Sequence, residues 1–378
     1  MTLPTKQYPF YIKSTVILLG LVLLSYALFT LQDILAPIAL SFIIAILLNP
    51  LTNKLQKKGL HKVVAISLSL ALTILIVAGI FYFISSQIIN FGDDMPKLKA
   101  KFNEHYAQLQ QWLATEVNIP VTKQQKMLAD VGNASQALVG KTLGGALGII
   151  SFFVLIPIYV FLMLFYKTLM LNFLHEVFAE ENAAKVHEVL GETKAAVQSY
   201  MVGLLLEALV VAVMNSVALL IIGVQYAILL GVIGALLNML PYIGGIIAIA
   251  LPVIIAFLTG DGGLTTSLVI IGAYAVIQFI DNNFLVPFLV SSRVKINAFF
   301  SIVVVLLGGA VWGVSGMFLS IPFVAIIKII FDRLPEMKPW GKLLGDEVPT
   351  RSINENIKRR NSKKKASVAE KVVNESAK

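Results

Sequence analysis

The stretch LLNMLPYIGGIIAIALP, residues 236–252, decides the fold that we expect for this chain. It lies inside the run Ala208–Gly260, which contains no charged side chain. Asn238, Pro241 and the pair Gly244–Gly245 nevertheless interrupt it. Glycine and proline weaken or break a helix, so a plain membrane crossing has no use for them near its centre. The stretch therefore predicts a break in the chain at membrane depth.

The composition indicates a membrane protein. Of its 378 residues, 57% are hydrophobic and 13% are charged, whereas soluble domains carry about 25% charged residues. Several segments lack charges over the roughly 20 residues that a spanning helix needs: 14–32, 34–53, 63–92, 142–166, 262–280 and 296–327. The predicted fold class is all-α, a polytopic transmembrane helical bundle. Because the chain has no cysteine, disulfides and thiolate metal sites are excluded.

The pattern of charges divides the chain into parts. We expect transmembrane helices over 1–92, an extramembrane helical cap over 93–141, a transport core over 142–340 with an amphipathic helix at 167–200, and a basic tail at 341–378. The first apolar run is long enough to span and has no small-residue cleavage pattern, so it is expected to be a retained helix and not a signal peptide.

Lysines and arginines orient these segments. The lysine-rich loop 54–62 is expected on the cytoplasmic side, together with both termini. The cluster at 358–365 is typical of a solvated cytoplasmic tail. Its expected contact is with membrane lipid, and we predict no nucleic-acid partner.

Two apolar runs, 226–258 and 296–331, are longer than one crossing requires. LPYIGG interrupts the first, and WGVSG, Trp312–Gly316, interrupts the second. As re-entrant hairpins these runs place Arg293 and Lys295 in the cytoplasm, which the charge bias favours. As full crossings they would place both cations outside. The sequence therefore predicts two broken, re-entrant helical hairpins, with Arg293 and Lys295 as a cytoplasmic gate or ion pair.

The tips of such hairpins are candidate pathway elements. Irregular backbone at membrane depth is tolerated only inside protein or beside a watery cavity, and paired broken helices often mark a transport route. Kinks or close helix packing are the structural alternative. The tip residues that we expect to line the pathway are Asn238, Pro241, Gly244, Gly245, Gly313 and Gly316.

Acidic and amide side chains also lie within apolar spans. Gln278, Asp281 and Asn282 fall within about one helical turn and share a face, and Glu207 lies in an earlier span. An acidic residue at a helix centre costs about 2.5–3.5 kcal/mol, so these four residues are predicted to belong to a substrate or ion pathway. Asn215 fits a hydrogen bond between helices.

Asp281 has a second interpretation. It could lie near the cytoplasmic interface as the ion partner of Arg293 or Lys295, which follow it in the chain. Both interpretations stay open at the level of sequence.

Enzyme chemistry is not indicated. The segment GVSG, residues 313–316, resembles the serine motif of rhomboid-type intramembrane proteases, but every histidine precedes it and none lies in a clear span. Such a serine needs a base. Asp281 has no second aspartate within the spans, and no phosphate-binding loop is present. We predict no catalytic residue, no metal and no cofactor.

The second half of the chain resembles the autoinducer-2 exporter (AI-2E) family of bacterial membrane proteins. The resemblance rests on residues 200–252, on QFIDNNFLVP (Gln278–Pro287) and on LLGGAVWGVSGMFLSIPFVAIIKIIFDRL (306–334). Glu207 stands where a neutral residue is common in that family. The resemblance implies a secondary exporter of the bacterial inner membrane. Some members are assigned to export of the quorum-sensing signal autoinducer-2, and others look like sodium/proton antiporters.

The leading hypothesis is therefore a secondary transporter that exports a small polar molecule or exchanges Na⁺ for H⁺. A membrane scaffold that recruits partners through the cap and the tail is one alternative, and a passive channel is another. Small residues on several spans are compatible with a homo-oligomer.

Overall fold

The computed structural model describes residues 9–93, 95–115, 120, 146–177, 179–240, 244–259, 263–290 and 295–346. Every regular element in these ranges is a helix, which confirms the all-α prediction. Most of the cap, most of the basic tail, Pro241 and Arg293 lie outside the described residues.

The helices follow the apolar runs of the sequence. The first half of the chain contains α1 (Phe10–Thr30), α2 (Gln32–Lys57), α3 (Lys62–Asp93), α4 (Met95–Thr115), α6 (Ala146–Phe165) and α7 (Lys167–Val177). The second half contains α8 (Ala179–Ile222), α9 (Ala227–Asn238), α10 (Gly244–Thr259), α11 (Gly263–Ile280), the π-helix η1 (Asp281–Val290), α12 (Ala298–Arg333) and α13 (Lys338–Leu344).

Six of the described helices are long and apolar enough to cross a membrane. A seventh candidate span is formed by α6 and α7 together, which meet at a bend of 62°. Helices are the expected form here because the hydrocarbon offers backbone groups no hydrogen-bond partner, and a helix satisfies them within one segment. The chain is thus a multi-span helical membrane protein.

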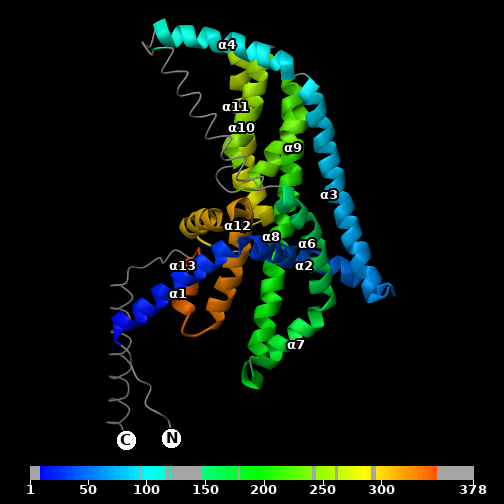
Figure 1. The fold of residues 1–378 in the computed structure, drawn as a ribbon, viewed down its shortest axis with the longest axis vertical. Coiled ribbons are helices and arrows are strands. Elements are labelled where there is room, and N and C mark those ends of the chain that lie inside the picture. Colours follow the sequence, from blue (N-terminus) through cyan, green and yellow to red (C-terminus); the bar gives the residue numbers. More distant parts are fainter. Residues whose placement is uncertain are drawn as a thin grey trace, which may run out of the picture.

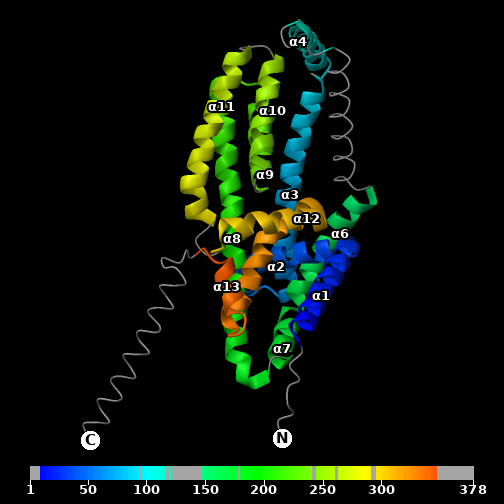
Figure 2. The same ribbon diagram turned by 90° about the vertical axis from the view of Figure 1, so that its left-hand side faces the viewer.

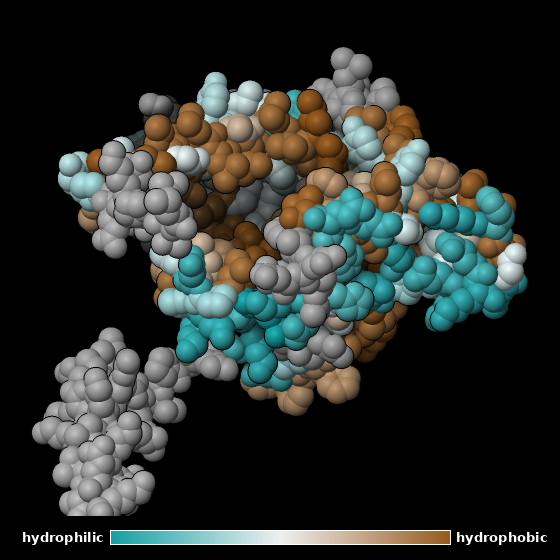
Figure 3. Space-filling model, turned by 90° about the horizontal axis from the view of Figure 1, so that it is seen from below, coloured by the Kyte–Doolittle hydropathy of each residue, from teal (hydrophilic) through white to brown (hydrophobic). Residues whose placement is uncertain are grey.

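Helix α8 is the longest element, and the other helices are arranged along it (Figures 1 and 2). Helices α9, α10 and α11 lie beside its upper part, whereas α13 lies in the lower half and α7 at the lower end, and α4 crosses the opposite end (Figure 1). Seen from the lower end, hydrophilic side chains gather beside extensive hydrophobic surface (Figure 3). The hydrophobic surface suits contact with lipid, and the hydrophilic end suits water.

The first interrupted run forms a helical hairpin. α9 turns back along α8 and α10 then packs against α9. The return is tight, because a Cβ atom on Gly231 of α9 would lie 2.3 Å from Ser216 Oγ on α8. At the tip, a Cβ on Gly244 would lie 1.6 Å from Leu237 O, so only glycine fits there.

The second interrupted run also folds back on itself. Trp312 and Gly313 have non-helical backbone angles inside α12, and Gly313 has φ of +58°. A Cβ on Gly308 would lie 2.5 Å from Gly316 O, and Ser320 Oγ donates a hydrogen bond to Val304 O (2.9 Å). Both contacts pair positions that are equally distant from residue 312, so the two halves of α12 are antiparallel.

Each long run therefore has the hairpin form that the interruptions predict. Whether the hairpins re-enter a membrane without crossing it stays a prediction. The segment 167–200 differs from the single amphipathic helix expected there: it is divided between α7 and the first half of α8. The apolar pattern continues into the following span, so the helix does not stop at residue 200.

We expect both ends of each hairpin to be accessible from one side of the membrane. Because the chain contains no cysteine, single cysteines placed at the exposed residues Gln225 and Leu264 can be labelled with a membrane-impermeant maleimide. The two positions should react from the same face of sealed vesicles. Labelling from opposite faces would show that 226–258 crosses the membrane.

Gly308→Ala should destabilise the second hairpin. The new Cβ would lie 2.1 Å from Ser320 Oγ, and overpacking of this kind costs about 1–3 kcal/mol. We expect a lower Tm in detergent. Gly272→Ala is the matched control, because a Cβ there meets nothing within 4 Å, and its Tm should not fall.

Candidate functional site

Asp281 lies at the junction of α11 and η1, and its side chain is 2% exposed. Its Oδ2 accepts a hydrogen bond from Asn238 Nδ2 (3.0 Å) and a longer one from Gln278 Nε2 (3.4 Å). Its Oδ1 has no hydrogen-bond partner, and no ion pair joins Asp281 to a cation among the described residues. The carboxylate is therefore buried, and only one of its two oxygens accepts hydrogen bonds.

The chain changes its helical geometry at Asp281. The residues Asp281–Val290 form a π-helix, which the sequence did not predict. Pro287 lies inside this segment and has no backbone N–H to donate, so the regular ladder of hydrogen bonds cannot continue through it. π-Helical turns occur frequently at functional sites.

The tip of the first hairpin approaches Asp281 from the other side. Asn238 is the last residue of α9, and Gly244–Gly245 begin α10. A Cβ on Gly245 would lie 3.4 Å from Gln278 Oε1 and 3.6 Å from Asn238 Oδ1. The amide groups thus turn their nitrogens to Asp281 Oδ2 and their oxygens toward Gly245.

A small pocket lies between α8, this hairpin and α11, with room for about one water molecule. Three of its polar atoms are buried without a hydrogen-bond partner in the described structure: Asn215 Oδ1, Tyr274 Oη and Asp281 Oδ1. Buried polar groups are nearly always bonded, so this concentration is exceptional. The complete lining is Val211, Asn215, Gly234, Asn238, Gly245, Ala248, Tyr274, Ile277, Gln278 and Asp281.

Glu207 lies on α8 and is 6% exposed. It does not line the pocket, but its charge lies close enough to Asp281 for the two carboxylates to repel each other. Asn282 is exposed, accepts a hydrogen bond from Gln278 Nε2 (3.2 Å) and also lies outside the pocket. The structure therefore brings Asn238, Gln278 and Asp281 together and leaves Asn282 at the margin.

Gly313 and Gly316 do not line the Asp281 pocket. Gly316 packs against Gly308 within its own hairpin. The two tips do share an apolar neighbourhood, since Met239 and Trp312 pack against one cluster of buried side chains. Trp312 Nε1 also donates a hydrogen bond to Leu28 O (2.9 Å), which ties the second tip to α1.

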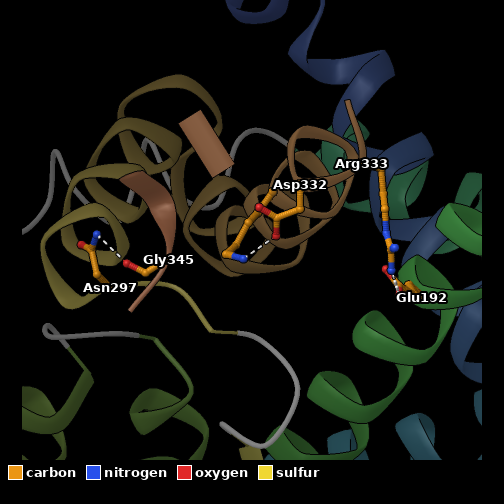
Figure 4. A network of polar contacts seen from close by, with 6 residues as sticks. Glu192, Asn297, Asp332, Arg333 and Gly345 are labelled. Carbon is orange, nitrogen blue, oxygen red and sulfur yellow. Dashed lines mark hydrogen bonds and ion pairs between the residues drawn. The ribbon is translucent and has the colours of Figure 1, made fainter. Parts of the chain in front are cut away.

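The cytoplasmic gate or ion pair expected at Arg293 and Lys295 stays a prediction. Arg293 lies outside the described residues, and Lys295 is exposed and has no ion pair with a described residue. Another arginine, Arg333 at the end of α12, forms ion pairs with Glu188 (2.8 Å) and with Glu192, both on α8. Figure 4 shows the contact with Glu192.

Further polar contacts hold the same end of the second hairpin. Asn297 Nδ2 donates to Leu343 O (2.8 Å) and to Gly345 O (3.2 Å), and Lys328 pairs with Asp332 (2.6 Å). Figure 4 shows the contact between Asn297 and Gly345. The two ends of α12 are thereby held near each other and near α13.

Two pocket residues lay outside the predicted pathway. For Asn215 the sequence predicts a hydrogen bond between helices, which stays a prediction, and its Oδ1 has no partner in the described structure. Tyr274 was not singled out, although it precedes Gln278 by four positions and Asp281 by seven. That spacing places all three on one helix face and was the signal that could have identified it.

Comparison with known proteins supports a transport role. "Putative permease PerM" of Escherichia coli (strain K12) is 28% identical over 82% of this chain and 89% of its own. "Putative transport protein YueF" of Bacillus subtilis (strain 168) is 25% identical over 78% and 82%. "AI-2 transport protein TqsA" of Escherichia coli (strain K12) is 24% identical over 83% and 90%.

The sequence profile of the AI-2E family transporters matches residues 15–336, which is nearly all of the described transmembrane region. The chain belongs to the AI-2E family of membrane transporters.

Proposed function

We propose that this protein is a secondary transporter in which Asp281 binds the coupling ion, a proton or a metal cation, while a small polar molecule is exported. The observation that carries the proposal is the buried carboxylate of Asp281, one oxygen of which is unpaired in the described structure. Leaving such a group unpaired is expensive in an apolar surrounding. A site that repeatedly binds and releases a cation accounts for that cost.

The order of features along α8 supports this role. Glu188 and Glu192 come first and hold Arg333. The buried residues Val197, Tyr200, Met201 and Leu204 follow, within an apolar cluster that also includes side chains from the two hairpin tips. Glu207 and then Asn215 come next. At 1.5 Å per residue, Asn215 lies roughly 35 Å from Glu192 and roughly 10 Å from the far end of α8.

The pocket is therefore occluded in this arrangement. The apolar cluster around Val197–Leu204 lies between it and the Arg333 end. A second apolar cluster, which includes Leu219, Val224 and Ile270, lies toward the opposite end and shares Tyr274 with the pocket lining. In the proposed cycle, these apolar side chains on both sides of Asp281 correspond to the occluded state of an alternating-access carrier and not to an open channel.

Opening would require the hairpins to move relative to α8. The ends of the second hairpin are held by ion pairs and hydrogen bonds at the water-exposed end, and partly exposed ion pairs of this kind are weak. We assign this end to the cytoplasm, together with both termini. Broken helices around a buried ion site are the arrangement that many secondary carriers use.

The size of the pocket and the similarity to one relative guide the proposal for the exported molecule. The pocket is too small for an organic solute, so the exported molecule would bind elsewhere along the route between the hairpins. The name of TqsA connects one relative with AI-2, and this furanosyl signal is the first cargo to test.

Asp281→Asn should abolish ion-coupled transport, because the amide cannot carry the ionic charge, while the helices still insert. Transport is measured in proteoliposomes as gradient-driven flux of candidate ions and of AI-2, and insertion is measured by yield and Tm. Asp33→Asn is the matched control, since Asp33 is exposed at the start of α2, and it should keep full flux.

Three outcomes would contradict the proposal. Full flux in Asp281→Asn would remove the role of Asp281. Flux that ignores every applied gradient would favour a channel. Loss of function on deletion of 341–378, with none in Asp281→Asn, would favour the scaffold.

A further inference from the structure

We infer that the pocket beside Asp281 is a binding site for one partly dehydrated monovalent cation of the size of Na⁺, with Asn215 and Tyr274 as ligands that complete it. The inference rests on the proposed function and deepens it, because it assigns the ion a binding site with two ligand residues that no motif identifies.

The first argument is the kind of atom that the pocket presents. Asn215 Oδ1, Tyr274 Oη and Asp281 Oδ1 are buried oxygens without a hydrogen-bond partner in the described structure, and their side chains are only 2%, 4% and 2% exposed. They come from α8, α11 and the start of η1, so three separate elements direct an oxygen into one small space. Hard cations prefer oxygen ligands of this kind.

The second argument is the direction of the neighbouring amides. Asn238 and Gln278 use their NH₂ groups on Asp281 Oδ2, which leaves their oxygens facing Gly245 on the pocket wall. The lining of the pocket is consequently rich in hydrogen-bond acceptor oxygens. One water molecule could donate to Asn215 Oδ1 and Asp281 Oδ1 and accept from the Tyr274 hydroxyl, but it would leave the negative charge of the buried Asp281 carboxylate unbalanced. A cation satisfies several oxygens at once.

The third argument is charge and size. One carboxylate lines the pocket, and Glu207 lies nearby outside it. A lining with one carboxylate suits a monovalent cation, whereas Ca²⁺ usually takes six to eight oxygens, several of them from carboxylates. The space holds about one water molecule, and a dehydrated Na⁺ is smaller than that.

Glycine keeps this space free. A Cβ on Gly234 would lie 3.3 Å from Asn215 Nδ2 and 3.7 Å from Tyr274 Oη. A methyl group at Gly234 or at Gly245 would therefore occupy the place where the polar side chains converge. The two small residues on the hairpin wall fit a site that must admit an ion.

The test is Na⁺ binding to the purified full-length protein in detergent. Titration with NaCl against choline chloride at constant ionic strength should give a saturable calorimetric signal and a Na⁺-dependent rise in Tm. Tyr274→Phe removes only the hydroxyl oxygen and should weaken Na⁺ affinity about tenfold or more, as expected for one lost ligand to a charge. Tyr82→Phe is the matched control, because Tyr82 is exposed, and its affinity should equal that of the unaltered protein.

The outcomes are separable from those of the transport assay. No saturable response to Na⁺, or equal affinity in Tyr274→Phe and the unaltered protein, overturns the cation site. If Tyr274→Phe lowers Tm in choline chloride, Asn215→Ala provides the same comparison from α8. Proton-driven flux that needs Asp281 without any Na⁺ binding would leave the proposed function standing and refute this inference. Na⁺ binding to the unaltered protein together with full flux in Asp281→Asn would support the cation site and refute the proposed function.

Discussion

A backbone that leaves its helix inside a membrane must be enclosed by protein, and the architecture around α8 depends on that constraint. The first hairpin meets α8 at Gly231 and Ser216 so closely that no side chain fits between them. On another part of α8, a Cβ on Gly203 would lie 2.1 Å from Leu289 O of η1. Through these glycine contacts, the first hairpin and η1 both pack closely against α8. The carboxylate of Asp281 lies where the tip of the first hairpin meets the start of η1.

The same enclosure determines the electrostatics of the site. Apolar clusters lie on both sides of the pocket that contains Asp281, and in an apolar surrounding charges interact far more strongly than in water. Two neighbouring carboxylates then repel each other, and each gains from a bound cation. A small displacement of a hairpin that admits water would weaken both the repulsion between the carboxylates and their attraction for a cation. Under the proposed function, ion binding and hairpin movement would be coupled through the dielectric of the pocket.

Much of the fold followed from the residues themselves. Charge-free runs of spanning length predicted the helices, and the interruptions at LPYIGG and WGVSG predicted where two of them turn back. The polar triplet around Asp281 was recognised because acidic and amide groups are costly in a span. The π-helix was not foreseen, since hydrophobic periodicity cannot distinguish it from an α-helix over ten residues. The ion pairs of Arg333 with α8 were also not predicted from the sequence, because an arginine in the last turn of a helix ordinarily faces water or lipid headgroups.

The sequence by itself determined which segments are helical, where their backbones break, and that a carboxylate stands among them, since these properties depend on local propensity and on the cost of polarity in lipid. Only the tertiary structure decided that Asn215 of α8 and Tyr274 of α11 meet at Asp281, and that Asn282 does not. Convergence of side chains from different helices depends on crossing angles and on close packing at particular glycines. Those quantities arise from contacts between distant segments, so no pattern within a single segment encodes them.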